Sequence, residues 1–287
     1  MNWDVTLVTY DRVPEGTEDD GLLADALRAM GARVRFCVWD DPAVDWAAAP
    51  ITCLRSIWDY FHKPEAFRAW LGQVEGQTRL VNPARVIRWN MDKRYLADLQ
   101  ARGIGTVPTL FAGPHDRLDL AQACAARGWA EVVVKPTVSG GAFGTKRFAR
   151  GELAFEGAAH LAALIERGGA MVQPYLPVVE TERERSLVYL DGVFSHAIRK
   201  TPFASSYASA SNHLPSADEL AFAETVLACV GETLAYARVD IAPMAGGSGL
   251  MELEVIEPCL LFAAKAGSGR RLAEILLAQT AWPASAS

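Results

Sequence analysis

The chain has 287 residues, of which 51% are hydrophobic and 22% charged, and its formal net charge is −6. This length favours two or three lobes, and the composition excludes a disordered or fibrous protein. The negative charge offers no broad basic surface for nucleic acid, and no apolar run is long enough to cross a bilayer. Five scattered cysteines without CxxC spacing predict neither a zinc site nor a disulfide framework. We therefore expect a cytoplasmic protein without a nucleic-acid or membrane partner.

The first segment, residues 1–88, is expected to form a small parallel α/β lobe. Apolar runs at 5–9 and 34–38 predict two strands, and Asp19 and Asp20 are predicted to cap the helix between them. A β-α-β order favours a parallel sheet. The turn after the first strand lacks the G-x-G-x-x-G pattern, so a dinucleotide fingerprint is absent.

Three polar side chains follow a third predicted strand, residues 51–54, and they are Arg55, Asp59 and Tyr60. The carboxyl ends of parallel strands are where α/β folds commonly bind ligands. A guanidinium can hold a carboxylate through two parallel hydrogen bonds, so Arg55 is a candidate anchor for a substrate carboxylate, with Asp59 and Tyr60 beside it. The alternative is a surface arginine paired with Asp59.

The second segment, residues 89–172, carries two lysines and a glycine-rich loop. Lys93 falls in the first turn of a predicted helix, and Lys135 ends an apolar strand just before the loop at 139–145. Three glycines permit close backbone approach, and successive N–H groups can cradle phosphate oxygens. A lysine at the end of an apolar strand beside such a loop favours a bound anion. A glycine hairpin without a ligand is the alternative.

The third segment, residues 173–287, begins with a predicted β-hairpin that turns at residues 191–192. Arg185 and Arg199 lie at the open end of this hairpin. Residues 202–213 are polar and unpatterned, which predicts a loop beside the cleft.

Three acidic side chains dominate the strands that follow. Glu252 and Glu254 alternate on one predicted strand, so both project to the same face, and a glycine turn returns the chain so that Asp240 lies beside them. Carboxylates gathered on a mostly apolar sheet repel one another unless a cation neutralises them. Oxygen-only ligands favour magnesium. The alternative is an edge strand with a solvated acidic face.

Taken in order, these motifs resemble the ATP-grasp superfamily, in its glutathione-synthetase-like branch, over about residues 85–265. The resemblance implies an α/β ATP-grasp fold, in which an N-terminal lobe precedes two lobes, 89–172 and 173–287, that enclose ATP. Many relatives have Glu-x-Asn on the last strand, whereas this chain has Glu at position 254, which leaves open whether Glu254 or Glu257 completes the metal shell.

The same resemblance assigns roles to individual side chains. It implies that phosphates are contacted by Lys93, Lys135 and the loop residues Ser139, Gly140 and Gly141. Adenine would be contacted by Gln173, Tyr175 and Leu176, and the ribose by Glu180. The ligands of Mg²⁺, for which Mn²⁺ can substitute, would be Asp240, Glu252 and Glu254, and the transferred phosphate would face Arg199 and Arg185.

Two stretches, residues 55–60 and 251–258, are also similar to the cyclo-ligases that close O-ureidoserine. This subgroup resemblance implies an enzyme that activates a small amino-acid-like carboxylate as an acyl phosphate, which a nitrogen of the same molecule attacks. We expect it to be a monomer or homodimer. Three alternatives remain open: an intermolecular carboxylate–amine ligase, a hydrolase that uses Glu252 and Glu254 as its acid/base pair, and a catalytically silent nucleotide-binding module.

Overall fold

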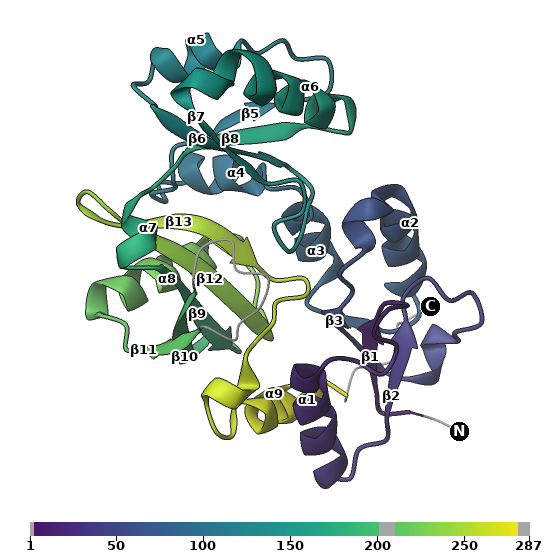
Figure 1. Cartoon of the computed structure of the whole chain (residues 1–287). Coiled ribbons are helices and arrows are strands. Elements are labelled where there is room, and N and C mark those ends of the chain that lie inside the picture. The colour runs from purple at the N-terminus through teal and green to yellow at the C-terminus, as the bar shows by residue number, and fades with distance from the viewer. Residues whose placement is uncertain (1–2, 201–209, 281–287) are drawn as a thin grey trace.

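Three β-sheets, each built from a different stretch of the chain, organise the protein (Figure 1). The structure is a computed structural model that describes residues 3–200 and 210–280. In Figure 1 the middle sheet lies above the third sheet, and the first sheet lies to the side of both. None of the helices in these ranges combines the length and the apolar composition that a bilayer-spanning segment needs.

The first sheet is parallel, with the strand order β2-β1-β3-β4. Its elements are β1 (Val5–Thr9), α1 (Glu18–Ala29), β2 (Val34–Val38), β3 (Ile51–Ser56), α2 (Pro64–Val74) and β4 (Arg79–Val81). The expected strands and β-α-β order are confirmed, but two details are corrected. Thr17 caps α1, and Asp20 is its capping-box partner in the third helical position. Strand β3 is also longer than predicted and includes Arg55.

The middle sheet is antiparallel, with the strand order β5-β8-β6-β7. Its elements are β5 (Leu110–Ala112), α5 (Leu120–Ala125), β6 (Glu131–Pro136), β7 (Lys146–Ala149), α6 (Ala158–Glu166) and β8 (Ala170–Pro174). Val132 and Val134 share a core with residues of both helices, which cover this face. Because side chains alternate along a strand, Lys135 points to the opposite face.

The third sheet is antiparallel, with the strand order β11-β10-β9-β12-β13. Its elements are β9 (Glu184–Leu190), β10 (Val193–Lys200), β11 (Ser211–His213), α8 (Ala217–Val230), β12 (Tyr236–Met244) and β13 (Gly247–Glu254). Helix α8 covers one face. The predicted loop at 202–213 is wrong at its end, because 211–213 pair with β10; residues 202–209 lie outside the described residues.

Helices α3 (Ala84–Asn90) and α4 (Tyr95–Ala101) connect the first sheet to the middle sheet, and α7 (Val178–Thr181) connects the middle sheet to the third. Helix α9 (Ser268–Ala278) follows the third sheet. Helix α4 contributes Tyr95, Leu96 and Leu99 to the core beneath the third sheet. Helix α9 packs beside α1, so the end of the chain returns to the first lobe (Figure 1). The lobe boundaries at 88/89 and 172/173 stay a prediction.

Candidate active site

The face of the third sheet that is turned away from α8 carries the predicted acidic residues. Asp240 on β12 is directly opposite Glu252 on β13, and Arg238 is opposite Glu254. Alternation along each strand therefore places all four side chains on one face. The sequence predicted this grouping for the three acids and missed Arg238, although Arg238 lies two residues before Asp240 and so obeys the same rule.

Basic side chains lie between these acids. Arg238 Nε is 3.0 Å from Asp240 Oδ1, and Arg238 Nη2 also pairs with Glu254. Lys200 Nζ lies 2.6 Å from Asp240 Oδ2 and 2.6 Å from Glu184 Oε1. The sequence analysis had not assigned Lys200 or Glu184 to the site.

The charges of this centre do not balance. Five carboxylates (Glu184, Asp240, Glu252, Glu254 and Glu257) face four cationic groups (Lys93, Lys135, Lys200 and Arg238). Burial would raise the pKa of Asp240, but Arg238 and Lys200 outweigh it and hold that pKa well below its usual range. Burial raises the pKa of Glu254 despite Arg238 beside it, and raises that of Glu257 to about 7. Glu254 and Glu257 therefore keep part of their protons at neutral pH, and a bound cation would favour their ionised forms.

The donor set suits a hard cation, because every candidate ligand is a carboxylate oxygen. In the described ranges, however, no group of three or more His, Cys, Asp or Glu side chains is already arranged to hold a metal ion. The ion pairs explain this, since Arg238 and Lys200 occupy the oxygens of Asp240 that a metal would need.

Lys135 and the glycine loop approach the acidic centre from the middle sheet, and Lys93 approaches it from the segment just before α4. Lys93 Nζ is 3.1 Å from Glu252 Oε1 and donates to the carbonyl oxygen of Ser139 at 2.5 Å. Burial and the charge of Lys93 lower the pKa of Lys135 although Glu252 acts against them, and Lys135 forms no ion pair with a described residue. A half-buried lysine without an ion-pair partner among the described residues is suited to an anionic ligand such as a phosphate.

The loop itself has the backbone that a phosphate cradle needs. Gly141 and Gly144 have φ of 55° and 69°, values that favour glycine, and Ala142 shares this conformation at 60°. A Cβ at Gly144 would lie 2.9 Å from Cγ of Pro136, so a larger residue would push the loop away from β6.

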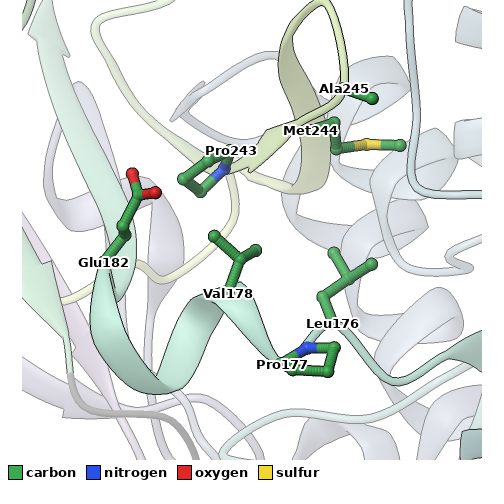
Figure 2. A pocket seen from close by; sticks show the side chains of 7 residues that line it. All are labelled: Leu176, Pro177, Val178, Glu182, Pro243, Met244 and Ala245. Carbon is green, nitrogen blue, oxygen red and sulfur yellow. The ribbon is translucent and has the colours of Figure 1, made fainter.

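The hinge after β8 carries the residues predicted to hold adenine and ribose. Gln173 is buried and donates to Thr109 Oγ1 at 2.9 Å. The Tyr175 hydroxyl donates to Glu180 Oε1 at 2.6 Å, and Arg147 pairs with Glu180 while its guanidinium lies 3.4 Å from the Tyr175 ring centroid. Leu176 lines an adjacent apolar pocket of about 330 Å³. Figure 2 shows Leu176 and Val178 on one side of that pocket, with Pro243 and Met244 on the other.

Arg185 and Arg199 do not face the site, and their predicted placement is corrected. They are cross-strand neighbours on the α8 face, where Arg185 Nη1 is 2.8 Å from Glu219 Oε1 and Arg199 Nε donates to His213 Nδ1 at 3.1 Å. Lys200, one residue beyond Arg199, projects to the opposite face, where its ammonium group pairs with Asp240 and Glu184.

Arg55 is corrected as well, because it is buried and forms part of the fold. Its Nε is 3.0 Å from Asp20 Oδ1, and its Nη2 donates to the carbonyl oxygen of Pro258 at 3.3 Å. Only Nη1 has no partner among the described residues, so a bidentate carboxylate pair is not available. The alternative pairing with Asp59 is also wrong.

The two other first-lobe candidates differ from each other. Asp59 accepts from Trp39 Nε1 at 2.7 Å and pairs with Lys63 at 3.1 Å, so its carboxylate is already engaged within the lobe. Tyr60 is buried against the acidic centre: burial and the charges of Glu257 and Glu252 raise the pKa of its hydroxyl. Of the pair, Tyr60 is the one that borders the site.

Comparison with known proteins places this geometry in context. Residues 5–82 match the model of the N-terminal domain of D-cycloserine synthetase DcsG. The cycloserine biosynthesis protein DcsG of Streptomyces lavendulae is 34% identical over 290 residues, which cover 94% of this chain and 93% of that protein.

Solved structures agree with the sequence comparison. The crystal structure of D-cycloserine synthetase DcsG matches with a TM-score of 0.89 at 30% identity, over 96% of this chain and 99% of that one. A RimK domain ATP-grasp protein from Sphaerobacter thermophilus DSM 20745 matches with a TM-score of 0.70 at 17% identity, over 96% of this chain and 98% of that one. D-alanine–D-alanine ligase from Bacillus anthracis, complexed with ATP, matches with a TM-score of 0.69 at 14% identity, over 97% of each chain. The last two matches support the fold alone.

Proposed function

The chain belongs to the D-cycloserine synthetase family of ATP-grasp ligases, and from this premise we propose that it closes one small amino-acid derivative, O-ureidoserine, into a ring. Membership makes it an ATP-dependent ligase that forms a C–N bond, which excludes the hydrolase and the silent module considered from the sequence. The ring-closing reaction and its substrate are the proposal.

One observation carries the assignment of chemistry to this site: Lys200 and Arg238 lie among carboxylates on one sheet face, and Lys93, just before α4, pairs with Glu252 of the same face. Phosphoryl transfer is catalysed chiefly by positioning and by cations that offset the charge on the transferred group. When phosphates enter, these side chains can exchange their carboxylate partners for phosphate oxygens. The freed carboxylates are then available to a metal ion.

The reaction balances with the groups at hand. A substrate carboxylate oxygen attacks the γ-phosphorus of ATP, the bond to the bridging oxygen breaks, and ADP leaves. The nitrogen of the same molecule then attacks the acyl carbonyl, phosphate leaves, and the nitrogen loses one proton. Intramolecular attack has a high effective concentration, so no pocket for a second amine is needed.

We assign the nucleotide as the family resemblance suggested. Lys93, Lys135 and the loop residues Ser139, Gly140 and Gly141 would contact phosphates, Gln173, Tyr175 and Leu176 adenine, and Glu180 the ribose. Asp240, Glu252 and Glu254 would hold Mg²⁺, with Mn²⁺ as a substitute. Bound there, the cation would neutralise phosphate charge. Glu252→Gln should then raise the Mg²⁺ concentration that gives half-maximal ADP release.

We also propose a cytoplasmic enzyme that works as a monomer or homodimer, without nucleic acid or membrane. All five cysteines are free, which fits a reducing compartment.

The deciding experiment supplies O-ureidoserine as the sole co-substrate with ATP and Mg²⁺ and identifies the product by mass spectrometry. A cyclic product with one ADP per ring is expected. ADP release that requires a separate amine, with a linear condensed product, would instead identify an intermolecular ligase.

Lys200→Met and Arg199→Met form a matched pair for the site assignment, because these neighbours point to opposite faces. Loss of Lys200 should lower turnover by roughly 100-fold or more, as when an electrostatic catalytic group is removed. Loss of Arg199 should leave turnover within about twofold, as expected for a surface substitution away from the site. The opposite ranking would reject the site as described.

A further inference from the structure

Glu257 is a carboxylate without a counter-ion at the wall of the active site. It follows the end of β13 by three residues, is half-buried, and accepts a hydrogen bond from its own backbone N–H. No described residue forms an ion pair with it, whereas Glu252 pairs with Lys93 and Glu254 with Arg238. A partly desolvated, unpaired carboxylate is costly unless a ligand supplies the missing charge.

The surroundings of Glu257 come from the first lobe and from the phosphate loop. Trp58 Nε1 of the first lobe donates to the Glu257 carbonyl oxygen at 3.3 Å, and the Tyr60 hydroxyl lies near its carboxylate. From the middle lobe, a Cβ at Gly140 would lie 3.8 Å from Glu257 Oε1 and 3.1 Å from Cε1 of Phe61. Glu257 is therefore enclosed between the first lobe and the tip of the phosphate loop.

The proposed metal ligands lie elsewhere on this wall. Asp240, Glu252 and Glu254 belong to the paired strands β12 and β13, whereas Glu257 lies beyond the paired residues, next to an aromatic rim of Trp58, Tyr60 and Phe61. Aromatic faces attract organic cations, and a carboxylate beside them completes a site for an ammonium group.

We propose that Glu257 binds the ammonium group of the amino-acid substrate and so makes the enzyme selective for α-amino acids. This inference rests on the proposed function. In an α-amino acid the ammonium is only two bonds from the carboxyl carbon. Lys93 and Glu252 lie near enough for their charges to act on Glu257. A substrate whose carboxyl group is held among Lys93, Arg238 and the acidic centre would therefore bring its ammonium group to the carboxylate of Glu257.

The test compares wild type with Glu257→Gln, which keeps the size of the side chain and removes its charge. With O-ureidoserine, KM should rise roughly 10- to 100-fold, the range expected for the loss of a charge-assisted hydrogen bond. KM for ATP and the Mg²⁺ requirement should not change. The analogue that lacks the amino group, 3-(ureidooxy)propanoate, should be poor for wild type and equally poor for the variant, because it makes no contact with Glu257.

The outcomes separate the two proposals. If wild type turns over O-ureidoserine and Glu257→Gln keeps its KM, the inference fails while the proposed function stands. A higher Mg²⁺ requirement with an unchanged substrate KM would make Glu257 a metal ligand and overturn the inference. If wild type turns over no amino-acid derivative, both proposals fail. A thermal melt of the variant, with Glu257→Asp as the charge-retaining control, separates misfolding from lost recognition.

Discussion

The contact between the first and third lobes differs from the contact that the middle sheet makes with its neighbours. Asn82 of the first lobe donates to the carbonyl oxygens of Tyr236 and Val255 at 2.9 and 2.8 Å, and accepts from Ala235 N–H at 2.8 Å. The Tyr236 hydroxyl lies 2.9 Å from the Leu54 carbonyl oxygen. These groups are buried, and α1 and α9 add a shared apolar core.

The middle sheet with its helices, residues 110–174, is joined to the rest more lightly. Residues 89–109 before it pack with the third lobe, where the Tyr95 hydroxyl accepts a hydrogen bond from the Leu253 N–H at 2.9 Å. The contacts of the middle sheet with the rest include a hydrogen bond from the Lys93 N–H to the Thr137 carbonyl oxygen at 2.8 Å and the Lys93 side chain at Ser139. At the loop tip, the Phe143 ring lies 5.5 Å from Phe61 and 4.6 Å from His62, measured between centroids. We infer that the first and third lobes, together with residues 89–109, form one body and that the active site opens and closes by movement of the middle sheet and its helices.

The free energy of unfolding should therefore depend on the interface between the first and third lobes. The number of ADP molecules released for each product molecule should depend on the contacts of the middle sheet with its neighbours.

Arg55→Met should cause the largest loss of stability, because it leaves the buried carboxylate of Asp20 without its cation. Breaking a buried pair typically costs about 3–5 kcal/mol. The matched control is Arg33→Met, which removes a pair with Asp4 at 3.0 Å whose side chains are 57% and 33% exposed. Exposed pairs contribute about 0–1 kcal/mol. Urea unfolding followed by circular dichroism measures both, and equal losses would contradict the assigned role of Arg55.

Asn82→Ala should destabilise by roughly 2–4 kcal/mol, since three buried backbone groups lose their partner at once. The contacts cross between lobes, so the variant should also show an earlier, separate transition for the first lobe in calorimetry. A single transition at the wild-type temperature would mean that this interface does not hold the two lobes together.

Much of the acidic face followed from local rules. Alternation along two short strands was enough to group Asp240, Glu252 and Glu254, and it would have found Arg238 by the same count. Arg199, which the family resemblance placed against the transferred phosphate, shows where this rule stops. A shift of one residue moves a side chain to the opposite face, and the sequence of β10 does not say which face meets the site.

Arg55 shows a second limit. Its place on β3 was nearly right, but its partner Asp20 comes from α1, 35 residues earlier. Which polar groups meet between distant elements depends on how those elements pack, and no spacing in the sequence records that. Glu184 and Glu257 were left without a settled role for the same reason.

Acid should weaken the Arg55–Asp20 contact, with a smaller effect than either substitution, because protonated Asp20 keeps hydrogen bonds. Burial would raise the pKa of Asp20, but Arg55, Thr17 and Ser56 outweigh it and hold that pKa below its usual value. A group with a lowered folded-state pKa stabilises the fold above its unfolded pKa of about 3.9, and this stabilisation is lost as pH falls through the folded value. The gap in urea midpoint between wild type and Arg55→Met should thus narrow below about pH 4. A difference in urea midpoint that stays constant down to about pH 3 would contradict the assigned contact between Arg55 and ionised Asp20.

Phe143→Ala should barely change stability, by less than about 0.5 kcal/mol, because the ring is 45% exposed and lies against Phe61 and His62 at the loop tip. Its effect should appear in coupling instead. If the Phe143 contact with Phe61 and His62 holds the phosphate loop over the active site, its loss admits water to the acyl phosphate, and more ADP is released for each product molecule.

The control is Phe155→Ala, since Phe155 is 77% exposed on the same lobe and takes no part in this contact. Parallel measurement of ADP and of product by mass spectrometry gives the ratio. A ratio that stays at the wild-type value in Phe143→Ala would mean that the aromatic contact does not keep the site closed, and the middle lobe would then need another way to exclude water.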